Sequence, residues 1–168
     1  MKRTLPVLLI FALFSADGAS QPGALEEPSP DFAGAWNLVS WELRLEDGST
    51  RPHRWNLGSL IYSDSGRMCW VGMEANRPTW REGSDPTNAE IIEAFQGVAS
   101  YCARVEVNAD QGFVLHHVDL GQYPNDHGIV RKRWFSFDGA DRLVLTIDPA
   151  ELSPPVVEST LVWERVGM

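Results

Sequence analysis

From residue 33 onward, apolar and polar residues alternate in short runs that are separated by turn residues. Alternation with a period of two is typical of β-strands that bury one face. The Asp, Asn and Gly residues between the runs are those that close antiparallel hairpins. The runs predict about eight strands: AWNLVSWELRL (35–45), LGSLIYS (57–63), RMCWVGM (67–73), YCARVEV (101–107), FVLHHVDL (113–120), IVRKRWFSF (129–137), RLVLTI (142–147) and STLVWERV (159–166).

One segment, SDPTNAEIIEAFQGVAS (84–100), has a helical period instead. Thr87 stands three residues before Glu90, which is the spacing of a capping box. We predict a helix over about residues 87–99, between the third and fourth strands, with its apolar face packed on the sheet. The apolar positions at helical spacing are Ile91, Ile92, Phe95, Val98 and Ala99.

Eight sequential strands joined by short turns would leave two raw edges in an open sheet. Closing the sheet removes both edges. We therefore expect a mainly β fold over residues 32–168: an eight-stranded antiparallel up-and-down barrel with the one helix. A barrel of this size is just wide enough to be filled by side chains or to hold one small ligand.

The first residues carry the pattern of a secretory signal peptide, residues 1–20. Lys2 and Arg3 precede an apolar run over residues 5–14, and small residues lead to Ser20. The run is shorter than the roughly 20 apolar residues of a membrane span. We expect cleavage about Ser20, a disordered leader over residues 21–31, and a secreted or periplasmic protein without an integral membrane span; an uncleaved anchor is the alternative.

Charge and cysteine content narrow the function classes further. The formal net charge of −9 would repel phosphate backbones, so we expect no nucleic-acid partner. Cys69 and Cys102 fall on predicted neighbouring strands with the same outward parity. In an oxidising compartment they form a cross-strand disulfide if the two residues are in register, and otherwise remain two free thiols.

Several blocks, taken in order, resemble the bacterial lipocalin-like domain family. GAWNLVSWEL, GSLIYSDSGRM, FVLHHVD, VRKRWFSFDGADRL and LVWERV carry the resemblance, which covers about residues 33–166. The resemblance implies a calycin-type barrel with an internal cavity for a small, largely apolar ligand. Gly34 to Trp36 is also similar to the G-x-W that opens the first strand of lipocalins. That likeness implies that Trp36 closes one end of the barrel and that Arg165 stacks on its indole. The competing α+β cone of the nuclear-transport-factor type places helices before most of its strands, and this chain does not.

An inward Trp36 would, by alternation, send Ser40 and Glu42 inward and Trp41 outward. The same parity on later strands gives an aromatic cavity with a few polar groups, which suits a planar or amphipathic molecule. The predicted ligand-binding residues are Ser40, Glu42, Leu60, Tyr62, Met68, Trp70, Tyr101 and His116.

Glu42 is the most informative of these residues. A buried carboxylate could orient a ligand or act as an acid or base, whereas at a rim position it would reach water or pair with an inward Arg. His116 is either a hydrogen-bonded structural residue or a catalytic one. If the chain is an enzyme, Glu42, His116 and Tyr62 are the expected acid–base residues.

Metal and cofactor motifs are missing from the sequence. His116 and His117 are adjacent and would point to opposite faces, and no Cys/His cluster, phosphate-binding Gly loop or G-x-S-x-G occurs. We expect no metal and no cofactor. The leading hypothesis is binding of a small hydrophobic or amphipathic molecule without chemistry. The alternatives are an isomerase, cyclase or hydrolase that uses the same cavity, and a structural envelope protein with a filled barrel. The oligomeric state stays open.

Overall fold

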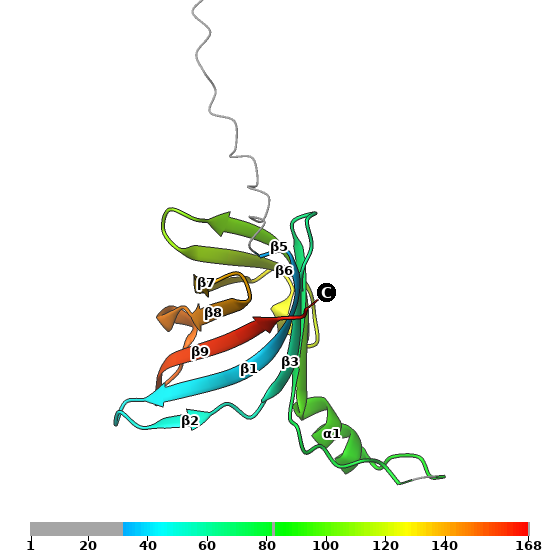
Figure 1. The fold of residues 1–168 in the computed structure, drawn as a ribbon. Coiled ribbons are helices and arrows are strands. Elements are labelled where there is room, and N and C mark those ends of the chain that lie inside the picture. Colours follow the sequence, from blue (N-terminus) through cyan, green and yellow to red (C-terminus); the bar gives the residue numbers. More distant parts are fainter. Residues whose placement is uncertain (1–31, 82, 168) are drawn as a thin grey trace, which may run out of the picture.

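The computed structural model describes residues 32–81 and 83–167 (Figure 1). The predicted signal peptide over residues 1–20, its cleavage about Ser20 and the predicted leader over residues 21–31 lie outside the described residues. The described strands are β1 (Gly34–Leu45), β2 (Thr50–Pro52), β3 (Leu57–Tyr62), β4 (Arg67–Met73), β5 (Val98–Asn108), β6 (Phe113–Gly121), β7 (Val130–Asp138), β8 (Arg142–Ile147) and β9 (Val156–Arg165). The helices are α1 (Asn88–Gln96) and the short 3-10 turns η1 (Pro124–Asp126) and η2 (Pro149–Glu151).

The strands form a closed antiparallel barrel, as predicted. Each long strand pairs with the next along the chain, and β1 pairs with β9 to close the sheet. The short strand β2 is an addition to the eight predicted strands. It pairs with the second half of β1, beyond the point where β3 leaves that edge. Counted with β2, the helix lies after β4, so its predicted place between the third and fourth strands is not exact.

A β-bulge in β1 changes which of its side chains face the interior. Leu38 pairs with Trp163 and Ser40 pairs with Val162, so Val39 is an extra residue opposite β9. Two successive residues then face outward, and the alternation continues in the opposite phase. Trp36 lies inside before the bulge, and Trp41 lies inside after it, 8% exposed.

This bulge overturns the predicted orientations of three side chains. Ser40 and Glu42 pair with Val162 and Thr160, which belong to the outer face of β9, and Glu42 is exposed. The predicted inward orientation of Ser40 and Glu42 is wrong, as is the outward orientation of Trp41. The physical reason is the single added residue, because a shift of one position moves every later side chain to the other face.

The end of the barrel that holds the N-terminus of β1 is closed by Trp36. Its indole N–H donates to the carbonyl oxygen of Phe32 at 2.9 Å, and the Arg165 guanidinium stacks 4.0 Å from its ring. Arg165 also donates to the carbonyl oxygen of Ala33 at 2.6 Å. Gly34 is required here because its φ is 133° and a Cβ would lie 2.8 Å from Arg165 Nη1. This is the arrangement that the G-x-W resemblance implied.

Helix α1 begins as predicted but packs differently. Thr87 and Glu90 form the capping box, with both reciprocal hydrogen bonds present. The helix ends at Gln96, because Gly97 turns the chain directly into β5 and so leaves no connection that could fold α1 back across the sheet. The predicted packing of its apolar face on the sheet is therefore wrong: Ile92 is 56% exposed, and α1 projects from one end of the barrel (Figure 1).

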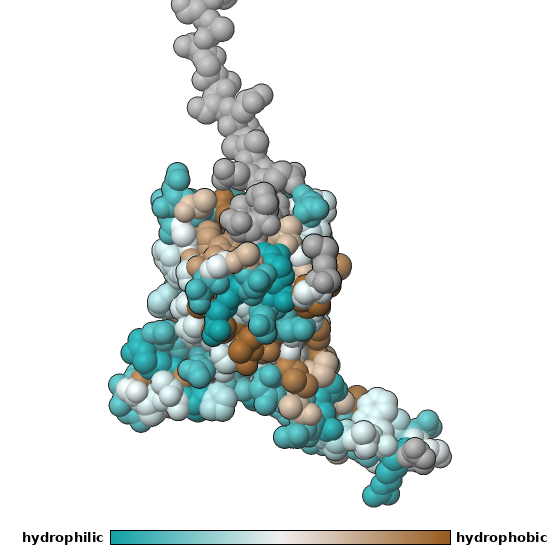
Figure 2. Space-filling model, in the orientation of Figure 1, coloured by the Kyte–Doolittle hydropathy of each residue, from teal (hydrophilic) through white to brown (hydrophobic). Residues whose placement is uncertain are grey.

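Part of the outer barrel wall is apolar as well. Figure 2 shows hydrophobic surface gathered over β3, where Leu57 and Ile61 are exposed. On the same wall Cys69 of β4 pairs in register with Cys102 of β5, and the two form a disulfide with an Sγ–Sγ distance of 2.08 Å. The register that the sequence left open therefore brings the two thiols together.

Candidate functional site

The barrel contains a hollow with two adjoining parts. The inner part, here the inner chamber, has a volume of about 40 Å³, and the outer part, here the outer vestibule, has a volume of about 250 Å³. Both are bounded by Trp41, Trp70, Tyr101, Arg133 and Ile147, so the vestibule adjoins the chamber at these side chains. The remaining walls of the chamber are Leu60, Met68, His116, Leu145, Leu161 and Trp163.

Most of the predicted ligand-binding residues lie at this hollow. Five of them line the inner chamber: Leu60, Met68, Trp70, Tyr101 and His116. Tyr62 is buried and bonds His116. Ser40 and Glu42 lie on the outer side of β1 and are not among the lining residues. The bulge replaces them with Trp41, which the alternation had placed outside.

A polar triad crosses the wall of the chamber. His116 Nε2 is 2.9 Å from the Tyr62 hydroxyl, and His116 Nδ1 is 2.9 Å from the Tyr101 hydroxyl. Burial, helped by the charges of Arg133 and Arg131, holds the pKa of His116 well below its usual value, so the imidazole is neutral. Burial likewise raises the pKa of Tyr62 and of Tyr101, which keeps both phenols protonated.

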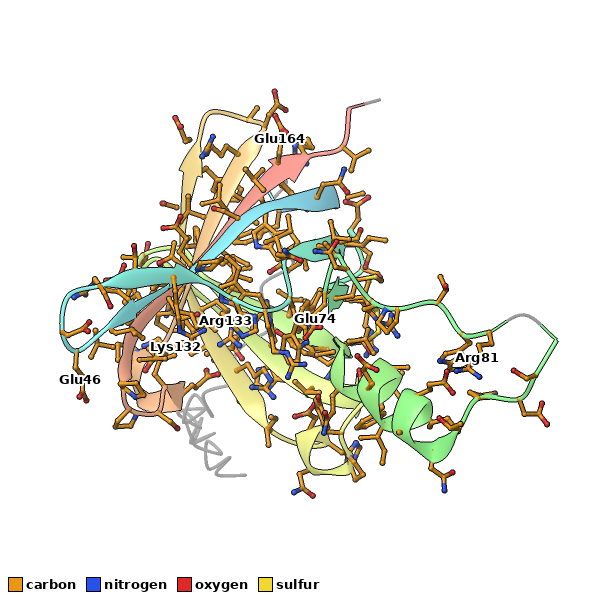
Figure 3. All side chains as sticks on the ribbon, turned by 90° about the horizontal axis from the view of Figure 1, so that it is seen from below. Glu46, Glu74, Arg81, Lys132, Arg133 and Glu164 are labelled. Atoms are coloured by element: carbon orange, nitrogen blue, oxygen red, sulfur yellow. A yellow bond between two sulfur atoms is a disulfide. The ribbon has the colours of Figure 1, made fainter. Side chains whose placement is uncertain are left out.

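Two arginines of β7 lie beside this triad. Arg133 is 7% exposed, and its Nη1 donates to Glu151 Oε2 at 2.9 Å and to the carbonyl oxygen of Lys132 at 2.6 Å. Arg131 donates to Asp126 Oδ1 at 2.7 Å and stacks 5.5 Å from the Tyr101 ring. Figure 3 views the molecule from below and labels Arg133 and Lys132, which are consecutive residues of β7.

The basic run of residues 131–133 is divided between the two faces of β7, as alternation predicts. Lys132 points outward, with its Nζ 3.9 Å from the Trp134 ring centroid. Arg133 was not among the predicted site residues, although the sequence carried a signal for it. Phe135 and Phe137 alternate with Ser136, and their parity places residues 131 and 133 on the same inner face.

The vestibule has an aromatic wall. The His53 ring stacks on Trp41 with a centroid distance of 3.7 Å and an interplanar angle of 10°. Trp55 and Trp70 each lie 5.9 Å from Trp41. Burial, together with the charges of Arg51 and Arg54, lowers the pKa of His53 to about 4. At neutral pH the wall is therefore uncharged at His53 and offers flat aromatic faces to the hollow.

The polar atoms of the chamber wall are almost all donors. Tyr101 and Arg133 supply O–H and N–H groups, and neither nitrogen of His116 is left over. Within the described residues, the indole N–H groups of Trp70 and Trp163 have no hydrogen-bond acceptor. No Asp or Glu occurs among the described residues that line the chamber.

The described residues meet neither the requirements of a metal site nor those of a membrane-spanning helix. No group of three or more His, Cys, Asp or Glu side chains in residues 32–81 and 83–167 could hold a metal ion. Among the same residues, no helix combines the length and apolarity that crossing a membrane requires.

Comparisons with known proteins give one family match. A family model described as a lipocalin-like domain matches residues 33–166. Among solved structures, a redesigned β-barrel aligns with a TM-score of 0.39 and 12% sequence identity, covering 82% of this chain and 93% of that chain. No curated protein matches the chain.

Proposed function

The chain belongs to the lipocalin-like domain family, and we propose that its barrel binds one small, largely apolar or amphipathic molecule. The observation that carries this proposal is the hollow in the barrel, whose outer vestibule of about 250 Å³ adjoins the inner chamber at the aromatic side chains of Trp41, Trp70 and Tyr101. That volume is slightly below the roughly 300–1,000 Å³ of small-molecule pockets, so the ligand is small.

The same hollow argues against a structural barrel filled by its own side chains. Cores pack closely, with few voids larger than a water molecule. Here the chamber alone has a volume of about 40 Å³, and it adjoins the vestibule of about 250 Å³. Empty space bounded by Trp41, Trp70 and Tyr101 serves a ligand better than it serves stability.

An acid–base enzyme is also less well supported than a binding protein. The predicted acid–base pair of Glu42 with His116 or Tyr62 cannot form inside the barrel, because Glu42 is on the outer face of β1. Both ring nitrogens of His116 are engaged by tyrosine hydroxyls, so neither is free to take a proton directly from a substrate.

We further propose that the protein acts after export, as a secreted or periplasmic binding protein. The signal-peptide pattern over residues 1–20 supports this proposal. The Cys69–Cys102 disulfide supports it independently, because disulfides persist in oxidising compartments and are rare in the cytosol.

Binding can be tested with a variant that fills the hollow. Leu161→Phe adds volume to the chamber wall, while Leu120→Phe makes the same change at a position that is 64% exposed. A panel of apolar and amphipathic molecules is titrated by calorimetry and by tryptophan fluorescence. We expect saturable binding to the parent and to Leu120→Phe, and loss of binding in Leu161→Phe. Failure of the whole panel to bind the parent protein would overturn the proposal.

The natural ligand can be identified directly. The protein is purified from its own host's extracytoplasmic fraction and measured by native mass spectrometry. We expect a bound species that is released on denaturation. A bare mass, together with failure of the panel, would favour the filled-barrel alternative.

A further inference from the structure

The Tyr62–His116–Tyr101 triad has one hydrogen-bond donor more than it can pair with acceptors inside the triad. A neutral imidazole has one N–H donor and one acceptor nitrogen, so one tyrosine donates to it and the other accepts from it. The accepting tyrosine keeps its own O–H hydrogen, and among the described residues no further hydrogen bond from either hydroxyl to an acceptor is found. The triad therefore holds one surplus donor.

Burial decides which hydroxyl carries the surplus hydrogen. Tyr62 is 1% exposed and packs against Phe32, where an unpaired donor would be costly. Tyr101 lines both the chamber and the vestibule. The favourable arrangement has Tyr62 donating to Nε2 and Nδ1–H donating to Tyr101. The Tyr101 O–H then points to a partner in the hollow.

Arg133 adds a charged donor at the same place. Its hydrogen bonds to Glu151 and Lys132 both leave from Nη1, while the side chain lines the chamber. Arg133 and Tyr101 both line the chamber and the vestibule, so the guanidinium and the phenol face the same hollow. Glu151 anchors the guanidinium from behind but does not line the chamber.

Resting on the proposed function, the geometry points to a ligand class: a monocarboxylate with a flat apolar body. Its carboxylate accepts hydrogen bonds from Arg133 and from the Tyr101 O–H in the inner chamber, and its apolar body lies against Trp41 and Trp55 in the vestibule. A carboxylate fits because it is an acceptor-only group with two oxygens, and charge-assisted bonds to it are roughly twice as strong as neutral ones. A ligand that ends in a donor would leave the Tyr101 and indole hydrogens without acceptors.

The chamber size agrees with this orientation. At about 40 Å³ it holds a few water-sized groups, which is enough for a carboxylate but not for a ring system. The larger vestibule, at about 250 Å³, takes the body. The charge of the site also differs in sign from that of the chain. The chain has a formal net charge of −9, whereas Arg133 is the one charged residue among the described residues that line the chamber.

The test compares two probes that share a body and differ in the head group. Naphthylacetic acid ends in a carboxylate at neutral pH, and naphthylethanol ends in a neutral hydroxyl. Both are titrated by calorimetry into the parent protein and into Tyr101→Phe, Arg133→Gln and the outward-facing control Lys132→Gln. We expect the acid to bind about tenfold or more tightly than the alcohol. Tyr101→Phe and Arg133→Gln should each remove most of that difference, and Lys132→Gln should keep it.

The outcomes separate this inference from the proposed function. Equal affinity for acid and alcohol, or equal weakening of both by Tyr101→Phe, would overturn the carboxylate inference and leave the binding function standing. Binding of neither probe, with failure of the wider panel, would overturn both. Tyr101→Phe removes one oxygen and keeps the ring, so it provides a readout even if Arg133→Gln does not fold.

Discussion

The indole N–H of Trp41 donates a 2.8 Å hydrogen bond to the Ser159 hydroxyl, and both residues are buried. The bond joins β1 to β9, the two strands whose pairing closes the barrel. Trp41 is also the residue against which His53, Trp55 and Trp70 pack at the vestibule. Barrel closure and the shape of the vestibule therefore depend on the same side chain.

Removing the Ser159 hydroxyl should weaken the barrel. Ser159→Ala leaves the Trp41 N–H buried without an acceptor, and we expect a loss of about 1–3 kcal/mol in the free energy of unfolding. Urea denaturation measures the loss. Ser136→Ala makes the same change at an exposed position of β7 and should cost less than about 0.5 kcal/mol. Equal effects of the two substitutions would show that the Trp41–Ser159 bond contributes nothing particular.

Replacing Gly34 by Ala should cost more stability than the same substitution in the open turn at Gly139. Gly34→Ala meets both a left-handed backbone, φ 133°, and a contact of 2.8 Å with Arg165 Nη1. Gly139→Ala meets only the backbone penalty, since its φ is 69° and nothing lies within 4 Å of the added Cβ. We expect both variants to be destabilised and Gly34→Ala to be destabilised by about 1–3 kcal/mol more, measured by urea denaturation. A smaller loss in Gly34→Ala than in Gly139→Ala would contradict the close approach of Arg165.

The strand pattern could be predicted from the sequence because alternation and turn residues are local signals. The bulge at Val39 could not, because it depends on the register between β1 and β9, which lie at opposite ends of the chain. Because of this one residue, the predicted orientations of Ser40, Glu42 and Trp41 were wrong. Alternation did hold along β6, so His116 faces inward between Val114 and Val118, which are also buried.

The packing of α1 could not be predicted from the local sequence pattern either, for a different reason. The capping box of Thr87 and Glu90 and the apolar spacing are properties of the helix alone, and they gave its start correctly. Whether its apolar face meets a sheet depends on the connection at Gly97. Arg133 is the opposite case, since strand parity along β7 indicates that it faces inward and the structure buries it, yet it was not among the predicted site residues.

The stability of the protein should fall as pH decreases from 6.5 to about 4. The folded protein lowers the pKa of His53 to about 4 through burial and the charges of Arg51 and Arg54, whereas the unfolded chain keeps the usual 6.5. In that window the unfolded state binds more protons, so the free energy of unfolding rises with pH and is lost on acidification. His116, with a pKa lowered chiefly by burial, acts in the same direction.

His53→Phe isolates the contribution of His53 to this pH dependence of the free energy of unfolding. The ring can still stack on Trp41, but it no longer titrates, so the variant should lose less stability than the parent between pH 6.5 and pH 4. His127→Phe is the control, because His127 is exposed, and it should keep the parent's slope. Urea denaturation across the window gives the slopes. Identical slopes for the parent and His53→Phe would contradict the lowered pKa of His53.

Export and disulfide formation should fail together when the signal peptide is disabled. Leu9→Arg places a charge in the apolar run, so the precursor should stay in the cytoplasm of a bacterial host, keep residues 1–20 and contain reduced Cys69 and Cys102. The parent should be recovered outside the cytoplasm with its N-terminus near Gln21. Intact mass before and after reduction reports the cleavage, and also the gain of two hydrogen atoms when the disulfide opens.

Leu25→Arg is the matched control, because it puts the same charge beyond the predicted cleavage position and should be exported and oxidised like the parent. Reduction of the exported protein should then lower its free energy of unfolding by about 2–4 kcal/mol, since the bridge spans a sequence separation of 33 residues. Export of Leu9→Arg with normal cleavage would exclude residues 1–20 as the export signal. An exported parent with two free thiols would show that β4 and β5 are not covalently joined, and would remove the disulfide as support for an oxidising compartment.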